Sequence, residues 1–364
     1  MKNKLRYITI IFIVFIFTLN VIPIALAKTR RAYLTDFILQ TEVHGEGFKN
    51  GIDGENPIIE ATSYALEILD LYGLNAHDIT DLESNLEADL EQMFDDNNVV
   101  LYDLYFLRKS LDILEYPIDP QLKNRIHEYL NQTEQVGGGF SFSNTTTLAS
   151  LSSTYFIVKL YSLIGESVPN TTIHRDWVLL CNNSDGGYGG NKSLTSTILN
   201  TYYAVSVLDE LGFINYLVDE DQTLTYLNTF YIQNPSDTEN HGGYLPDITA
   251  NYPLLSSTYF AIKAISIINE TSLNKNPTIL WVLNRQNFQD GGFADISQGT
   301  DQLSSSIFSS YYAFGALMIL DPSLSKLSSE VFMVEFNYWI LIIIFACIGL
   351  VVGIGVIIWK RRRI

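Results

Sequence analysis

A glycine-centred turn followed by an apolar segment with a tyrosine near its start recurs along the chain, and no other feature constrains the fold as strongly. The four clearest turns are Gly137-Gly138-Gly139-Phe140, Asp185-Gly186-Gly187-Tyr188, His241-Gly242-Gly243-Tyr244 and Asp290-Gly291-Gly292-Phe293. A looser first copy has Gly47-Phe48, and a degenerate second copy has Asp96-Asn97-Asn98 without glycine. Self-similarity with a period of about 50 residues is typical of helical repeat proteins.

Each repeat is expected to contain two helices. In the third repeat, residues 120–131 are polar with an apolar stripe of Leu122, Ile126 and Leu130, which is typical of an outer helix with one buried face. The segment that follows it is apolar on most sides, which indicates an inner helix. Six such pairs predict an all-α fold, an α/α toroid of six helical hairpins over residues 28–325.

The glycine turns are expected to be structural. Glycine permits a positive φ and lets an aromatic ring lie against a neighbouring backbone between the two helices of a hairpin. The residues with this expected role are Gly47, Phe48, Gly138, Gly139, Phe140, Gly186, Gly187, Tyr188, Gly242, Gly243, Tyr244, Gly291, Gly292 and Phe293.

The two ends of the chain predict export and a membrane anchor. Basic residues precede an apolar run that ends in Ala25-Leu26-Ala27, which predicts a signal peptide at 1–27, with an uncleaved signal anchor as the alternative. Residues 338–359 carry no charge and have tryptophans at both ends, which predicts a transmembrane helix. Residues 326–337 would link it to the toroid. The basic tail at 360–364 places the C-terminus in the cytoplasm and the toroid outside the cell membrane.

The charge of the chain excludes one class of partner. The net charge of the 364 residues is −18. Seven of the 22 basic residues lie at the two ends, so the predicted outer domain has 15 basic against 40 acidic side chains. A formal charge of −25 repels nucleic acid. Of the two cysteines, Cys181 lies in the outer domain and Cys347 in the predicted span, so no disulfide is expected within the outer domain.

The turns and the helices that follow them resemble the repeats of protein prenyltransferase β subunits and of squalene or terpenoid cyclases. The resemblance rests on Gln40, Gln135, Gln233 and Gln286 ahead of the glycine turns, each followed by a tyrosine-bearing helix. It covers nearly the whole outer domain. It implies the α/α toroid fold, and it implies prenyl transfer or terpenoid cyclisation on an isoprenoid as the activity.

The catalytic motifs of that superfamily are not matched. The resemblance implies a zinc site of Asp-x-Cys plus a later histidine, but the chain has no Asp-x-Cys, and the histidine position falls near Phe308. The arginine of the diphosphate clamp corresponds to Leu199, although Arg285 or Lys263 could supply part of another basic pocket. The acidic string at Asp219 is better interpreted as a helix cap than as a cyclase acid. We therefore expect neither a metal nor another cofactor.

The remaining candidate site residues are the tyrosines of the inner helices and the polar residues of the turns. A ligand cavity would be lined by Tyr64, Tyr155, Tyr202, Tyr259, Tyr311, His241 and Asp247. Aromatic residues at helical spacing are more often plain core. Similarly, His44 and His241, in equivalent turns, are more readily explained as turn-stabilising side chains. Glycan hydrolysis, which needs two opposed carboxyl groups, would draw on Glu42, Glu46, Asp247 and Asp295.

Three functions remain open from the sequence. The favoured one is a membrane-anchored, extracytoplasmic and non-catalytic toroid that binds an isoprenoid or other lipid-like ligand, a glycan or a membrane protein. The second is a divergent prenyltransferase or terpenoid cyclase. The third is a glycan-active enzyme, which depends only on the location and on the acidic loops.

Overall fold

The computed structural model describes residues 28–295 and 305–331. The chain divides into two compact units, Arg30–Ser328 and a unit made of both chain ends. In the second unit, β1 (Lys28–Thr29) pairs antiparallel with β6 (Glu330–Val331). The predicted signal peptide at 1–27, span at 338–359 and tail at 360–364 lie outside the described residues, as does the second half of the predicted linker, 332–337. Among the described helices, none has the length and apolar character needed to cross a membrane.

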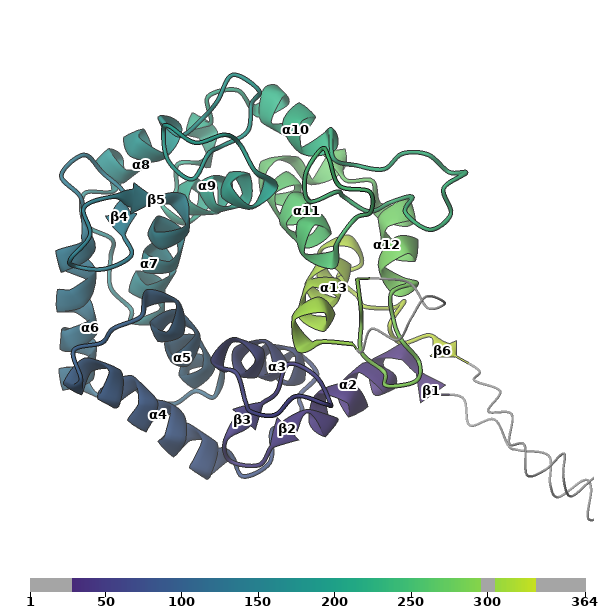
Figure 1. Cartoon of the computed structure of the whole chain (residues 1–364), viewed down its shortest axis with the longest axis horizontal. Coiled ribbons are helices and arrows are strands. Elements are labelled where there is room, and N and C mark those ends of the chain that lie inside the picture. The colour runs from purple at the N-terminus through teal and green to yellow at the C-terminus, as the bar shows by residue number, and fades with distance from the viewer. Residues whose placement is uncertain (1–27, 296–304, 332–364) are drawn as a thin grey trace, which may run out of the picture. The chain divides into compact units, whose positions relative to one another are not determined.

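The unit Arg30–Ser328 consists of outer and inner helices that alternate along the chain (Figure 1). The outer helices are α2 (Arg30–Gln40), α4 (Ile79–Asp95), α6 (Pro120–Thr133), α8 (Thr171–Leu179), α10 (Glu220–Asn228) and α12 (Lys275–Leu283). The inner helices are α3 (Ile59–Leu71), α5 (Leu101–Ile113), α7 (Leu151–Leu163), α9 (Ile198–Glu210), α11 (Leu255–Asn269) and α13 (Ile307–Leu320). Two short 3-10 helices, Ile214–Tyr216 and Glu270–Ser272, follow α9 and α11.

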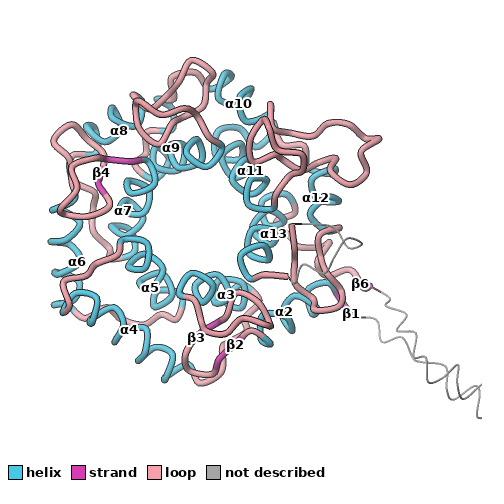
Figure 2. The backbone as a smooth tube through the Cα atoms, in the orientation of Figure 1, coloured by secondary structure: helices cyan, strands magenta, loops and turns pink. Residues whose placement is uncertain are grey.

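The inner helices form a closed ring with the outer helices around it (Figure 2). Each inner helix packs against the next, and α13 packs back against α3. The Ile307 backbone N–H donates to the Asn50 carbonyl at 2.7 Å, which joins the last hairpin to the first. The predicted all-α toroid is confirmed, and the described residues contain all six predicted hairpins.

The two kinds of helix differ in how much of their surface is buried. In α6, Leu122, Ile126 and Leu130 are buried, while most of the polar residues between them are exposed or half-buried. Asp119 caps this helix by accepting from the backbone N–H groups of Gln121 and Leu122. In α7, by contrast, most residues are buried, because its inner neighbours α5 and α9 pack against it and its Tyr161 hydroxyl donates to Asn131 of α6. Burial of an apolar side chain contributes roughly 1.5–3 kcal/mol, so the inner ring contributes most of the core.

Each glycine turn places one aromatic residue in the core between the outer and inner helices. These residues, Phe48, Phe140, Tyr188, Tyr244 and Phe293, are all 0% exposed. The backbone N–H of each donates at 2.9–3.0 Å to a hydroxyl of the next inner helix, provided by Thr62, Thr154, Thr201, Thr258 and Ser310 respectively. Two of these turns contain strand pairs, β2 (Glu42–Val43) with β3 (Gly47–Phe48), and β4 (Phe140–Ser141) with β5 (Ala149–Ser150).

Gly242 shows why the turns need glycine. Its φ is +100°, and a Cβ atom built there would lie 2.4 Å from the Pro277 carbonyl oxygen. A side chain would therefore meet both backbone strain and the start of α12.

Polar side chains of the turns also join neighbouring hairpins. The Gln286 amide donates to the Arg30 carbonyl at 2.9 Å and so links α12 to α2 across the closure of the ring. In the first and third turns a glutamate takes the place that Gln286 has in the last turn. Glu42 accepts from the His77 backbone N–H, and Glu134 accepts from the Asn170 side-chain amide at 2.8 Å.

The sequence resemblance rested on four glutamines. Within the described residues, only Gln286 among them donates a hydrogen bond to a neighbouring hairpin. Gln135 instead donates to Thr133 and Ser141 near its own turn.

Candidate functional site

The six inner helices enclose a central space, here called the lumen, and aromatic side chains from all six helices fill one layer of it. The layer is defined by helix position, counted from the N-caps Ile58, Val100, Ser150, Thr197, Leu254 and Ser306. The fifth residue after the cap is Ser63, Tyr105, Tyr155, Tyr202, Tyr259 or Tyr311. The sixth is Tyr64, Phe106, Phe156, Tyr203, Phe260 or Tyr312. We call these twelve positions the aromatic layer.

The helix positions correct the expected equivalence of Tyr64 with the other repeat tyrosines. Thr62 accepts the N–H of Phe48 as Thr154 accepts that of Phe140, which fixes the register of the first repeat. In this register Ser63, and not Tyr64, is equivalent to Tyr155. The Ser63 side chain is fully buried, and its Oγ has no hydrogen-bond partner among the described residues.

The rings of the layer contact one another around the lumen. Tyr64 stacks on Tyr311 with ring centroids 3.7 Å apart, which bridges the first and last inner helices. The hydroxyl groups of Tyr155 and Tyr202 lie 2.9 Å apart, and the ring centroids of Tyr202 and Phe260 are 5.2 Å apart. Burial raises the pKa of Tyr155 well above its ordinary value, so these phenols remain neutral at physiological pH.

A lysine from α5 approaches the aromatic layer from within the lumen. Lys109 Nζ lies 5.3 Å from the ring centroid of Tyr311 and 5.5 Å from that of Tyr64, within the range of a cation–π contact. The same ammonium group lies 2.5 Å from Glu67 Oε2.

Two more lysines occupy the helix position of Lys109, one turn beyond the aromatic layer. These are Lys159, which pairs with Glu210, and Lys263. Burial, together with the charge of Lys159, lowers the pKa of Lys263. The lysines follow Tyr105, Tyr155 and Tyr259 by four residues, a spacing that places them on the same helix face. Sequence reasoning missed this Tyr-x-x-x-Lys pattern, although it is visible in the printed sequence.

Little free space remains between these side chains. The cavity that they line, with Glu60 and Tyr102 at its edge, has a volume of about 80 Å³. Pockets that bury small-molecule ligands typically measure roughly 300–1,000 Å³. In this conformation the protein's own side chains therefore occupy most of the lumen at the level of the aromatic layer.

The structure does not bring His241 and Asp247 into the lumen with the tyrosines. The His241 ring contacts the Ile232 carbonyl at 3.1 Å, and Asp247 is exposed and accepts from Thr249. Neither residue lines the central cavity.

The acidic residues considered for glycan chemistry include Asp295, which accepts the N–H of Leu255 at the start of α11 at 2.7 Å. Asp219 caps α10 by accepting from Gln222 at 2.9 Å, as expected.

A second cavity, of about 190 Å³, lies beside Arg285 and away from the lumen. Glu239 and Asp295 also line it. Arg285 is 3% exposed and donates to the Glu239 carbonyl at 2.8 Å. The acidic neighbours oppose the binding of a phosphate at this arginine.

Comparisons with known proteins agree on the fold. The family model of the prenyltransferase alpha-alpha toroid domain matches residues 77–175 and 166–336. Among solved structures, the protein geranylgeranyltransferase-I of Candida albicans, complexed with GGPP, matches with a TM-score of 0.57 and 15% identity, over 78% of this chain and 90% of that one.

A second solved structure is a variant of the type II terpene cyclase MstE from Scytonema in complex with geranylgeranyl dihydroxybenzoate. It matches with a TM-score of 0.54 and 10% identity, over 80% of this chain and 97% of the other. No curated protein matches the sequence. Because the family match covers most of the chain, the protein belongs to the prenyltransferase alpha-alpha toroid family.

Proposed function

We propose that the protein is a membrane-anchored, extracytoplasmic toroid that binds a partner on its outer surface and has no prenyltransferase or cyclase activity. The observation that carries the proposal is the aromatic layer of the lumen, where the rings and Lys109 leave a cavity of about 80 Å³. A twenty-carbon prenyl chain needs several times this volume.

The charge at the layer also argues against cyclisation. Aromatic faces can stabilise a carbocation, but here the faces of Tyr64 and Tyr311 already have the ammonium group of Lys109 nearby. A carbocation at the same place would compete with this ammonium group, which is paired with Glu67, for the same ring faces. Leu199 contributes no cation where the resemblance implies the arginine of a diphosphate clamp, so diphosphate departure has no evident electrostatic support at that position.

The proposed location rests on the patterns at the two ends of the sequence. The predicted signal peptide at 1–27, the apolar segment at 338–359 and the basic residues after it support an anchored toroid on the outer face of the cell membrane. The strongly acidic outer domain supports a protein or glycan partner rather than an anionic lipid surface.

The first test is enzymatic and uses the full-length chain in mild detergent. We expect no turnover of geranylgeranyl diphosphate or of a linear polyprene, and no isoprenoid in an organic extract analysed by mass spectrometry, because the cavity at the aromatic layer is too small for the chain. A Lys109→Met variant, which removes the cation, serves as the matched control and should be equally inactive. Stoichiometric isoprenoid, or turnover that depends on Lys109, would overturn the proposal and favour the divergent enzyme.

The second test addresses the location. A C-terminal tag on the intact chain should resist protease added outside the cell, while the toroid should be accessible to a labelling reagent that does not cross membranes. Labelling of the tag and protection of the toroid would refute the proposed topology.

A further inference from the structure

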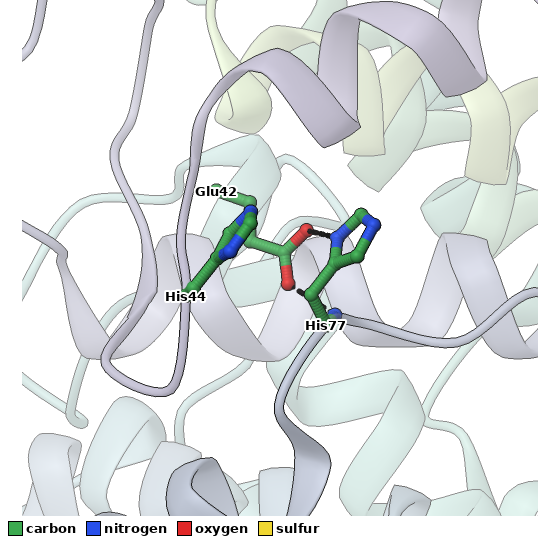
Figure 3. A group of neighbouring side chains, drawn as sticks. All are labelled: Glu42, His44 and His77. Carbon is green, nitrogen blue, oxygen red and sulfur yellow. Dashed lines mark hydrogen bonds and ion pairs between the residues drawn. The ribbon is translucent and has the colours of Figure 1, made fainter.

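Two histidines and a glutamate from two segments of the chain lie close together (Figure 3). Glu42 lies in β2, and His44 lies in the turn that follows it. His77 belongs to the loop that leads into α4. One potential ligand atom from each residue lies within 4.8 Å of the other two. This is the one such group of three found among the described residues.

We propose that Glu42, His44 and His77 form a binding site for a divalent transition metal ion of the Zn²⁺ type. Two imidazoles and one carboxylate form a common ligand set for Zn²⁺, and water then completes a tetrahedral shell. The site lies apart from the lumen cavity, and none of its ligands belongs to the zinc pattern that the family resemblance implied.

The carboxylate is already oriented toward its partners. The Glu42 side chain is only 2% exposed. Its Oε2 lies 2.6 Å from His77 Nδ1, and its Oε1 accepts from the His77 backbone N–H. A buried carboxylate held this way loses little conformational freedom when it binds an ion.

The histidines can complete the site by rotating their side chains. Their rings stack with centroids 4.7 Å apart, and both side chains are more than half exposed. Tetrahedral coordination at Zn–N distances of about 2.0–2.1 Å needs ligand atoms roughly 3.3 Å apart. Exposed imidazoles can make this adjustment by changes in χ1 and χ2 alone. The Asp78 carboxylate, 3.7 Å from His44 Nδ1, can orient that ring from outside the coordination shell.

The bound ion would link the first turn to the second hairpin. Glu42 and His44 follow α2, whereas His77 precedes α4, so the ion would strengthen the link that Glu42 already makes between neighbouring hairpins. The equivalent turn of the fifth repeat also has a histidine, His241, but its ring contacts a backbone carbonyl at 3.1 Å. It therefore provides a matched control within the same chain.

The test is a calorimetric titration of the full-length, chelator-treated chain with Zn²⁺. We expect one ion per chain with a Kd in the micromolar range or below, and a visible absorption spectrum typical of tetrahedral geometry when Co²⁺ replaces Zn²⁺. His44→Ala and His77→Ala should each weaken binding at least about tenfold. Glu42→Gln keeps an acceptor for the His77 N–H, so it should weaken binding without loss of the fold. His241→Ala should bind like the wild type.

Equal affinity of the wild type and the His44→Ala and His77→Ala variants would overturn the proposal, as would the absence of binding at 100-fold the expected Kd. Circular dichroism of each variant, compared with the His241→Ala control, separates loss of the site from loss of the fold. If His77→Ala does not fold, the Glu42→Gln titration decides the result. None of these outcomes depends on whether the toroid is catalytic.

Discussion

The connection from an outer to an inner helix takes two forms in this ring. Between α6 and α7, residues 134–150 make a long turn in which Phe140 enters the core and donates its N–H to Thr154. Between α4 and α5, residues 96–100 make a short link without a glycine, and Leu104 has the helix position of Thr154. The buried hydroxyl occurs where the turn inserts an aromatic residue. The hydroxyl thus serves the turn, because a buried N–H needs an acceptor.

The largest effect is expected from a glycine of the long turns. Gly242→Ala forces a Cβ atom into the Pro277 carbonyl at a φ of +100°, and should lower the free energy of unfolding by about 2–5 kcal/mol. Gly212, which has a φ of +75° and no neighbour within 4 Å, is the control. Gly212→Ala should cost about 1–2 kcal/mol from backbone strain alone. Urea denaturation measures the free energy of unfolding of both variants. If the two variants lose the same amount, close packing around the turn is not the reason for its glycine.

A smaller effect is expected from the hydroxyl that accepts the turn N–H. Thr154→Val keeps the shape of the side chain but leaves the Phe140 N–H without its acceptor, at a cost of about 1–3 kcal/mol. Thr154→Ser keeps the acceptor and should lose less. Thermal denaturation, with hydrogen exchange of the Phe140 amide, distinguishes the two variants. If valine is tolerated as well as serine, the proposed coupling between turn and hydroxyl is wrong.

The smallest effect concerns the turns whose aromatic residue is a tyrosine. Burial raises the pKa of Tyr188 to about 12, from the model-compound value of 10.0. The unfolded chain therefore loses this proton at a lower pH than the folded chain, and stability falls as pH rises from about 10 to 12. The Tyr188→Phe variant should lose about 1 kcal/mol less of its free energy of unfolding at pH 11 than the wild type does. Its dependence of stability on pH near pH 7 should be unchanged. Melting temperatures at the two pH values measure this difference. An unchanged alkaline slope would mean that Tyr188 ionises without unfolding.

The sequence predicted the repeats, the two kinds of helix and the toroid, because glycine turns and helical periodicity are local signals. It misplaced Tyr64 by one residue, since matching by residue type overlooked the hydroxyl of Thr62 that fixes the register. The small size of the cavity at the aromatic layer was foreseen only as the plain-core alternative, because free volume depends on side chains from six helices at once.

The group of Glu42, His44 and His77 was not predicted either. The fold alone brings His44 and His77 together from different hairpins. Nothing in the sequence indicated that Glu42 would link the first turn to the next hairpin, as Gln286 does at the last turn.

Closure of the ring has a consequence for how the chain folds during synthesis. The contact of α13 with α3, including the stacking of Tyr311 on Tyr64, joins segments from opposite ends of the domain. Earlier hairpins can dock on their neighbours as they emerge, but this contact must wait for nearly the whole domain. Until then the ring is open, and the tyrosines of its terminal inner helices are exposed to water. The nascent chain would thus be most prone to aggregate just before the last hairpin closes the ring. A chaperone would have the largest effect at this stage.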